Sequence, residues 1–337
     1  MTTNRGLSRR DFLKWGGAGV AGATLFGVAG CGGGQEGGEQ EGGSGLVERG
    51  SIRIEMPTHM IPPDPNTAIM QNSAEQGVSD MGVEAQFRGP EQFSIPAIRQ
   101  IFEAAIAADP DGIAATMPDP DALGPLVERA VNEGIPVVLF NAGLDVWQEQ
   151  GALTYVGQEE LDAGIAAGER MAQEGVTNAL CINHQQGQLT LETRCQGFDE
   201  GLGGTVKQVA VSGENPTATR NGIETALRQN PDAEGLLTLG PGVAEQALRA
   251  VEAAGKSDSV QVATFDISPE VLKAVRDGNL LFAIDQQMFL QTYLSVVFLT
   301  QYIQNRLVPA TAVPSGPVFV TRQDAEEILK LAGQGIH

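Results

Sequence analysis

The feature that most constrains this fold is an alternation between short apolar runs and helical stretches of about a dozen residues. Ten runs resemble strands, namely SIRIEM, VEAQF, GIAATM, PVVLFN, LTYVG, NALCIN, VKQVAV, GLLTLG, VQVATFD and LLFAID. This alternation is typical of parallel sheets with helices on both faces, so the sequence predicts a doubly wound α/β fold. About 280 residues carry it, which exceeds one compact core and favours two domains.

An excess of acidic side chains limits the partners of such a chain. Asp and Glu number 42 against 21 Lys and Arg, and the formal net charge is −21. A surface of this charge repels phosphate backbones, so we expect no binding to nucleic acid. A solvated acidic surface is the simplest interpretation of the excess.

The first 31 residues have the order of an export signal. Arg9 and Arg10 precede a run of apolar and small residues that ends at Cys31, which resembles a twin-arginine signal. Residues 28–31 (VAGC) resemble a bacterial lipobox, in which the Cys31 thiol would be lipidated. The alternative is a transmembrane anchor, but residues 15–30 are shorter than the about 20 residues that a span needs. We expect an exported chain that is lipid-anchored to the outer face of the cytoplasmic membrane.

A Gly-rich acidic segment follows the signal. Residues 31–50 contain little that could be buried, and we expect them to form a flexible tether. Removal of residues 1–30 would delete four basic and one acidic side chain and leave a formal charge of −24. The folded part is then expected to begin near Ser51.

Polar side chains stand where several predicted strands end. Asp266 follows an apolar strand in VATFDISPEV, Gln286 follows the strand of AIDQQM, and Gln158 stands at another strand–helix junction. Carboxyl ends of parallel strands gather at one edge, where ligands bind, and a carboxylate there can accept hydrogen bonds from hydroxyl groups. The alternative for Asp266 is that it caps the helix that begins near Ser268.

These residues carry a family resemblance over residues 51–331. The chain resembles the type I periplasmic substrate-binding proteins of ABC sugar importers, the ribose- and galactose-binding class. The markers are PTHMIPPDP, PDPDALGPLVERAVNEGIPVVLFNAG, ALCINHQQGQLTLETRCQGF, VATFDISPEVLKAVRDGNLLFAIDQQ and SGPVFVT. The resemblance implies two similar domains that hinge shut around a sugar and are joined by three crossings near Gln158, Gln286 and Ser315. The N-terminal domain would comprise residues 51–158 and 287–315, and the C-terminal domain residues 159–286 and 316–337.

The resemblance also implies a set of ligand contacts. The positions that match sugar contacts of the class are Asn141, Arg194, Phe265, Asp266 and Gln286. The guanidinium of Arg194 could donate hydrogen bonds to two hydroxyl groups at once. The ring of Phe265 could face the C–H surface of the ligand. Gln286 lies at one of the expected hinge crossings.

Three loops complete the expected site. His59 lies in the first loop, where the class places polar ligand contacts. Residues 64–67 read Asp-Pro-Asn-Thr where close relatives often read Asp-Pro-Phe-Trp, and residues 240–242 read Gly-Pro-Gly where many place an amide or acid. Both departures leave the identity of the sugar undetermined, and a polyol or a pentose would also fit. Trp147 either supplies an aromatic wall from the loop after the fourth strand or packs as an ordinary surface residue.

The charges expected at the cleft favour a neutral ligand. Asp64, Asp119 and Asp266 would roughly offset Arg194 and a protonated His59, which leaves no cationic cluster for an anion. We therefore expect a neutral sugar or sugar alcohol.

The residues of an enzyme are not assembled in this sequence. It has three histidines, His59, His184 and His337, and no Cys-x-x-Cys, His-Glu-x-x-His or Gly-x-Ser-x-Gly motif. Residues 17–22 match a dinucleotide-binding pattern, but no strand precedes them. We expect no catalysis, no cofactor and no metal.

Cys181 on a predicted strand and Cys195 on the next helix remain as an even pair outside the cytosol. Either a disulfide or two buried thiols would fit.

Two functions agree with these expectations. One is a receptor, expected to be a monomer, that delivers its sugar to the membrane permease of an ABC importer. The other is a sensory module that signals its closure to a chemoreceptor or histidine kinase.

Overall fold

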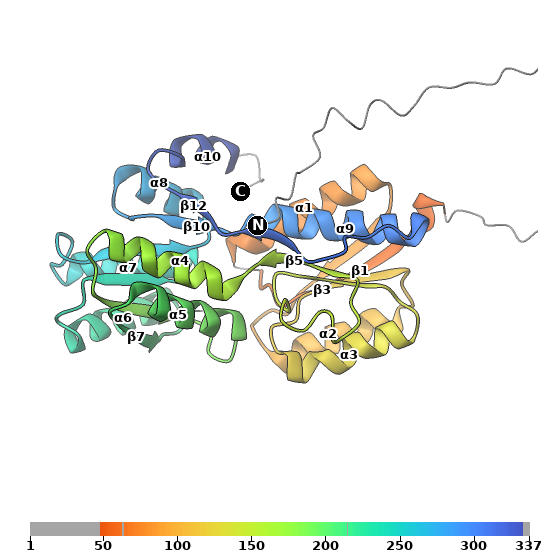
Figure 1. Ribbon diagram of the computed structural model, residues 1–337, viewed down its shortest axis with the longest axis horizontal. Coiled ribbons are helices and arrows are strands. Elements are labelled where there is room, and N and C mark those ends of the chain that lie inside the picture. The colour runs from red at the N-terminus through yellow and green to blue at the C-terminus, as the bar shows by residue number, and fades with distance from the viewer. Residues whose placement is uncertain (1–47, 63, 214, 333–337) are drawn as a thin grey trace, which may run out of the picture. The chain divides into compact units, whose positions relative to one another are not determined.

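The computed structural model describes residues 48–62, 64–213 and 215–332, whose strands form two six-stranded sheets (Figure 1). The first sheet contains β1 (Arg53–Pro57), β2 (Glu84–Arg88), β3 (Gly112–Ala115), β4 (Val137–Phe140), β5 (Thr154–Gln158) and β11 (Val313–Gly316). The second contains β6 (Asn178–Asn183), β7 (Thr205–Ala210), β8 (Gly235–Thr238), β9 (Gln261–Phe265), β10 (Ala283–Asp285) and β12 (Val318–Val320). Their orders are β11-β5-β4-β3-β1-β2 and β12-β10-β9-β8-β6-β7. Within the described residues, every strand pair except β10 with β12 is parallel, which confirms the predicted doubly wound fold.

Helices cover both sheets, and each sheet with its helices is called a lobe below. The first lobe contains α1 (Pro65–Met81), α2 (Ile95–Ala107), α3 (Pro120–Asn132) and α9 (Met288–Asn305). The second contains α4 (Glu160–Gln173), α5 (Leu189–Leu202), α6 (Pro216–Gln229), α7 (Pro241–Ala253), α8 (Pro269–Asp277) and α10 (Ala325–Ala332). A short 3-10 helix, Arg49–Ser51, precedes β1, at the place where the sequence predicted the end of a tether.

The strands are apolar throughout because both of their faces are buried. In β4, Val137 and Leu139 join one core cluster of the first lobe, while Val138 and Phe140 join the cluster on the opposite face. Successive side chains of a strand point to opposite faces, so an uninterrupted apolar run fills two layers at once. The second lobe repeats this arrangement with two clusters of its own.

Five helices begin with the same local chemistry. Each has a capping side chain that accepts a hydrogen bond from a backbone N–H of the first turn, followed by proline at the first or second helical position. The capping residues are Asp64, Ser94, Asp119, Asn215 and Ser268. These caps fix where each helix begins after the loop that follows a strand.

Helices α4 and α5 pack with their backbones in close contact. A Cβ atom added at Gly164 of α4 would lie 2.4 Å from the carbonyl oxygen of Arg194, and one added at Gly197 of α5 would lie 2.2 Å from that of Leu161. Only glycine permits this approach. The contact holds the N-terminal half of α5, which carries Arg194, against the start of α4.

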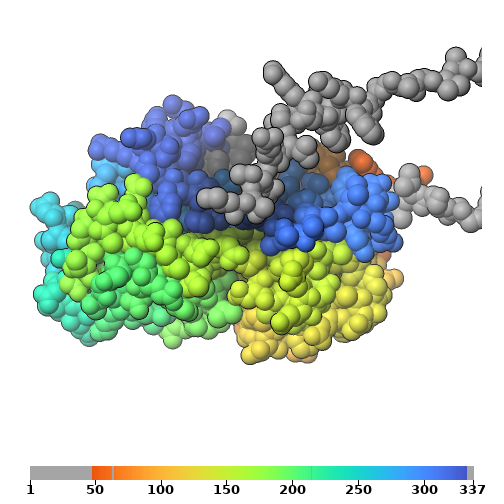
Figure 2. Space-filling view, viewed as in Figure 1, coloured from red at the N-terminus to blue at the C-terminus, as the bar shows by residue number. Residues whose placement is uncertain are grey.

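The chain passes from one sheet to the other three times. The crossings follow Gln158 at the end of β5, Asp285 at the end of β10 and Gly316 at the end of β11. Figure 2 shows the lobes meeting along a line, with a notch between the segments coloured green and yellow. The predicted signal and the predicted lipidation site at Cys31 lie outside the described residues.

Candidate functional site

A polar cavity lies where loops of both lobes meet. Its volume is about 50 Å³, and it is called the central cavity below. From the first lobe and the crossing after β10 it is lined by His59, Met60, Ile61, Asp64, Asn66, Asn141, Gln286 and Met288, and from the second lobe by His184, Gln185, Gln188, Leu191, Arg194, Leu239, Gly240 and Asp266. The structure therefore brings together five of the predicted ligand contacts, which are His59, Asn141, Arg194, Asp266 and Gln286.

Asp266 follows β9 and directs its carboxylate at residues of both lobes. One carboxylate oxygen accepts a hydrogen bond from Nε2 of Gln286 at 2.5 Å, and the other accepts one from Nδ2 of Asn66, in the first lobe, at 3.1 Å. The helix that follows is capped instead by Ser268, whose Oγ accepts the N–H of Val271 at 3.1 Å. The alternative in which Asp266 serves only as that cap does not hold.

Two strand ends turn sharply to present their side chains. Asp266 after β9 and Asn141 after β4 have φ values of 64° and 62°, in the left-handed region. Asp and Asn tolerate this conformation better than other non-glycine residues. Left-handed residues of this kind concentrate at ligand sites.

Arg194 is held by a buried partner on the neighbouring helix. Its Nε lies 2.5 Å from Oε2 of Glu160 and its Nη2 lies 3.0 Å from Oε1, so the pair is bidentate. The two side chains are only 5% and 8% exposed. The Phe265 ring lies beneath the guanidinium, 4.5 Å from ring centroid to Cζ, and is itself fully buried. Phe265 therefore supports Arg194 and does not line the cavity.

A network of amides connects the crossings to the cavity. Nδ2 of Asn141 donates to Oε1 of Gln286 at 3.0 Å and to Oε1 of Gln291 at 2.9 Å. Nε2 of Gln291 donates in turn to Oγ of Ser315 at 2.9 Å, on β11. Buried amides in such a network specify one geometry, because each unpaired group would be costly.

His59 is a neutral hydrogen-bonding group in this structure. Its Nδ1 lies 2.8 Å from Oγ1 of Thr116, and its Nε2 lies 3.1 Å from Nε2 of Gln188 in the second lobe. Burial, together with the charge of Arg194, lowers the pKa of His59 to about 4. The protonated His59 that entered the expected charge balance is thus absent near pH 7, which leaves Arg194 as the cation among the described residues of the lining.

Four predicted contacts lie elsewhere. Asp119 caps α3 by accepting the N–H of Ala122 at 3.0 Å, and Trp147 packs against the core of the first lobe. Gln158 is fully buried and donates to Oε2 of Glu160 at 2.9 Å. With Phe265, these side chains support the fold or the Arg194 pair, and none of them lines the central cavity.

Several residues of the site were missed by sequence reasoning. At Asn66 the sequence indicates only that an aromatic residue of close relatives is missing. In the structure, its side chain donates a hydrogen bond from the first lobe to Asp266. Gln188 precedes α5, and its position gives no signal of its contact with His59. Glu160 begins α4 and pairs with Arg194. A search for polar residues in the first turn after each predicted strand would have found Glu160.

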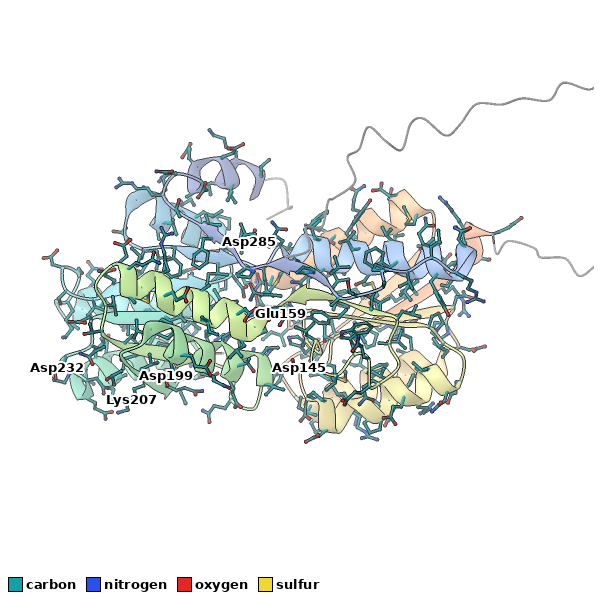
Figure 3. The ribbon with its side chains drawn as sticks, in the orientation of Figure 1. Asp145, Glu159, Asp199, Lys207, Asp232 and Asp285 are labelled. Atoms are coloured by element: carbon teal, nitrogen blue, oxygen red, sulfur yellow. A yellow bond between two sulfur atoms is a disulfide. The ribbon has the colours of Figure 1, made fainter. Side chains whose placement is uncertain are left out.

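Acidic groups also occur beside the central cavity. Asp145, after β4, and Glu159, before α4, are labelled in Figure 3 and line a second small cavity of about 60 Å³. Burial and the charges of Asp162 and Asp145 raise the pKa of Glu159. Across the described ranges, no group of three His, Cys, Asp or Glu side chains could hold a metal ion.

The structure joins Cys181 of β6 and Cys195 of α5 in a disulfide, with the two Cα atoms 5.7 Å apart. Cys195 follows Arg194 directly, so the bond ties the helix that carries Arg194 to the sheet.

Replacing both cysteines with alanine is expected to lower the free energy of unfolding by about 3 kcal/mol, because the bond closes a loop of about 15 residues in the unfolded chain. Urea unfolding of the oxidised protein and of the double variant measures this difference. The variant should be insensitive to a reductant that destabilises the parent protein. Equal unfolding midpoints for the parent with and without reductant would contradict the expectation.

Comparisons with known proteins agree with this architecture. The model of the periplasmic binding protein domain matches residues 60–307, and that of the twin-arginine translocation signal matches residues 6–26. The signal and the domain together indicate export to the periplasm. Among the described residues, none of the helices has the length and apolarity needed to cross a membrane.

Two curated relatives and one solved structure are informative. The xylose/arabinose-binding protein XylF of Sulfolobus acidocaldarius is 26% identical over 262 residues, which cover 72% of this chain and 65% of XylF. The ribose import binding protein RbsB of Salmonella typhimurium is 30% identical over 174 residues, which cover 50% of this chain and 57% of RbsB. The chain thus spans less than two thirds of either relative.

A carbohydrate transporter from Acidothermus cellulolyticus, crystallised with myo-inositol, is 36% identical with a TM-score of 0.81, and the match covers 85% of this chain and all of that one. The fold of that structure is therefore shared by most of this chain. The chain belongs to the periplasmic binding protein domain family.

Proposed function

We propose that this protein is an exported receptor that captures a neutral sugar or sugar alcohol in the central cavity and delivers it to the permease of an ABC importer. The observation that carries the proposal is the Asp266 carboxylate, which faces hydrogen-bond donors of both lobes at the cavity. Ionised carboxylates are strong, acceptor-only partners for hydroxyl groups.

The charges at the cavity favour a neutral ligand. Arg194 is the cation of the lining, and Glu160 already neutralises it in a bidentate pair. Asp266 and Asp64 add carboxylates, and the described residues of the lining include no further cation. An anionic ligand would therefore meet repulsion, whereas hydroxyl groups can both donate and accept.

Unsatisfied polar atoms also support binding of hydroxyl groups. Oε1 of Gln188 is buried, and among the described residues it has no hydrogen-bond partner. Gln188 lines the central cavity beside His59. Such an atom is costly unless a ligand or water supplies a donor.

Closure of the lobes is the expected means of capture. Asn66 contacts Asp266 and His59 contacts Gln188 across the two lobes, so a bound ligand could join the same groups. We place the domain boundaries at the three crossings, with residues 51–158 and 287–315 in one domain and residues 159–286 and 316–337 in the other. Hinge motion about a few such residues is common in ligand closure.

The remaining expectations complete the proposal. We infer a lipid anchor at Cys31, a monomeric receptor and no catalytic activity. The relatives named above bind xylose and arabinose, ribose, or myo-inositol according to their descriptions, and these cyclic polyhydroxyl compounds define the ligands to test first. Nothing in the structure or in the comparisons supports the sensory alternative.

Thermal unfolding with candidate ligands tests the proposal. The exported protein is melted with myo-inositol, ribose, xylose and arabinose, and with glutamate and glycine as controls. A ligand that binds only the folded state raises the melting temperature by mass action. We expect a selective rise with one polyhydroxyl compound. A rise with glutamate alone, or a cooperative melt that no polyhydroxyl compound shifts, would refute the proposal.

Ligand affinity is expected to depend on pH through Asp266. Burial raises the pKa of this carboxyl to about 7, against the opposing effects of Arg194 and Gln286. If the ionised form binds hydroxyl groups, lowering the pH from 8 to 5.5 should weaken binding by about 10- to 30-fold. Isothermal titration calorimetry at several pH values measures this, and Asp266→Asn should give a flat profile. An equally steep profile in that variant would assign the effect to another group.

A further inference from the structure

A larger cavity, different from the one lined by Asp145 and Glu159, adjoins the central cavity. Its volume is about 500 Å³, within the range of small-molecule sites, and it is called the outer cavity below. The two cavities share Ile61, Asp64, His184, Gln185 and Gly240 in their linings. A ligand bound at Asp266 would reach the outer cavity past these shared residues.

The outer cavity offers polar groups from both lobes and one aromatic ring. The first lobe contributes Gln92 and Phe93, and the second contributes Gln185 and Ser212. The half-buried Phe93 ring packs edge-on to His59, with centroids 6.3 Å apart, so it stands between the two cavities. An aromatic face beside amide and hydroxyl groups suits the mixed apolar and polar surface of a sugar ring.

An unsatisfied buried atom lies at the boundary of the two cavities. Nδ1 of His184 is buried and lacks a hydrogen-bond partner among the residues that the structure describes. Burial, with the charge of Arg194, lowers the pKa of His184 to about 4, so the ring is neutral at pH 7. Its Nδ1 can then pair with a ligand hydroxyl as donor or acceptor, depending on the tautomer.

The start of α7 adds backbone donors. Gly240 is the capping residue of this helix and makes no side-chain capping hydrogen bond. Backbone N–H groups of a first helical turn have no partner within their helix. Pro241 at the first position has no N–H, so the donors of this turn are the N–H groups of Gly242 and Val243, and both residues line the outer cavity.

The charges of the outer cavity exclude an anionic group. Asp64 and Glu91 line it, and the described residues of its lining include neither lysine nor arginine. A phosphate or carboxylate substituent would meet two carboxylates and no counter-charge. A neutral hydroxylated group does not have this cost.

We propose that the cleft takes a two-ring ligand, in which a polyhydroxyl ring held at Asp266 carries a neutral glycosyl group in the outer cavity. The ligand is thus a disaccharide or a glycosylated polyol. This inference rests on the proposed function, because it needs the central cavity to hold the first ring.

Calorimetric titration with matched pairs of compounds tests the inference. The pairs are myo-inositol with galactosyl-myo-inositol, xylose with xylobiose, and arabinose with arabinobiose. For one pair, we expect the two-ring compound to bind about 10-fold more tightly than its single ring, as one or two additional hydrogen bonds would give. The corresponding ring phosphate should not bind.

A blocking variant separates the two cavities. A Cβ atom at Gly242 would meet no atom within 4 Å. Gly242 lines the outer cavity and does not line the central cavity. Gly242→Trp should therefore fill the outer cavity, weaken the two-ring compound by about 10-fold or more, and leave its single ring within about 2-fold. Gly50→Trp is the matched control, since Gly50 is equally unobstructed and lies far from the site in the 3-10 helix before β1.

The outcomes distinguish the two proposals. Two results would overturn this inference alone. In the first, a single-ring compound binds and no two-ring compound binds more tightly. In the second, the affinities of both compounds for Gly242→Trp equal their affinities for the parent protein. Tight binding of a ring phosphate would overturn its neutral ligand class. Failure of every polyhydroxyl compound to bind would overturn the proposed function as well. The gain from the second ring, lost in Gly242→Trp and kept in Gly50→Trp, would establish the inference.

Discussion

Replacing Asp266 with alanine is expected to weaken binding of the polyhydroxyl ligand at pH 8 by about 100-fold or more. The carboxylate would accept hydrogen bonds from ligand hydroxyl groups in a buried site, where each charge-assisted bond contributes about 1.5–3 kcal/mol. The variant also leaves the amides of Asn66 and Gln286 without their acceptor. Isothermal titration calorimetry with the ligand found by thermal screening measures the loss.

The stability of the unliganded protein gives the control. The folded-state pKa of Asp266 lies above its ordinary value of 3.8, so this group stabilises the fold most below about pH 4, and that contribution is lost as the pH rises to about 7. Asp266→Asn should accordingly melt at the same temperature as the parent or higher at pH 8. A large drop in melting temperature would show that the carboxylate is structural.

Asp119→Ala serves as a matched carboxylate variant. Asp119 was expected from the sequence to contact the ligand, but it caps α3. Its replacement should lower the free energy of unfolding by about 1 kcal/mol and leave the affinity unchanged.

Replacing Arg194 with methionine is expected to have the largest effect on stability, a loss of about 3–5 kcal/mol, together with loss of ligand binding. The change leaves the buried Glu160 carboxylate without its counter-ion, and uncompensated buried charges are strongly destabilising. Urea unfolding measures the loss. The control Arg129→Met breaks an exposed pair with Glu133, at 2.8 Å, and should cost about 1 kcal/mol or less.

A double variant tests this explanation. Adding Glu160→Gln to Arg194→Met removes the uncompensated charge, so most of the lost stability should return while ligand binding stays lost. The expected coupling between the two sites is about 3 kcal/mol or more, because Glu160→Gln alone also leaves a buried charge without its partner. Additive losses would mean that Arg194 stabilises the fold by packing on Phe265, and that its pairing with Glu160 contributes little.

The strand–helix alternation was enough to predict the fold because it is a local signal. Each of the ten predicted runs forms a strand, since apolar residues on both faces of a strand such as β4 are visible in the sequence itself. The strands β11 and β12 were not among these runs. They are short, contain or flank Pro314 and Pro317, and depend on pairing with strands far away in the chain.

The site could be predicted only where chemistry and chain position coincide. Asp266 and Asn141 stand directly after strands, so the edge rule for parallel sheets identified their location. Asn66 lies 200 positions from Asp266, and no local pattern reveals that contact. Asp119 also stands before a helix, but the sequence does not say whether such a carboxylate turns to its own helix or to a ligand.

Phe265 shows the limit of transferring a role by resemblance. Its position matches a sugar contact of the family, whereas here the ring is fully buried beneath the Arg194 guanidinium. The match identified the right part of the chain. However, it is the neighbouring Asp266 that lines the central cavity, and Phe265 does not.

The packing of α4 on α5 has a consequence for how this protein can diversify. A side chain at Gly164 or Gly197 would collide with the backbone of the opposite helix, whereas one at Gly242 would meet no atom within 4 Å. Position 242 in the wall of the outer cavity can therefore change without a clash, while positions 164 and 197 in the helix pair that holds Arg194 are restricted to glycine. Comparison of natural variants should therefore show substitutions at position 242 and glycine at positions 164 and 197.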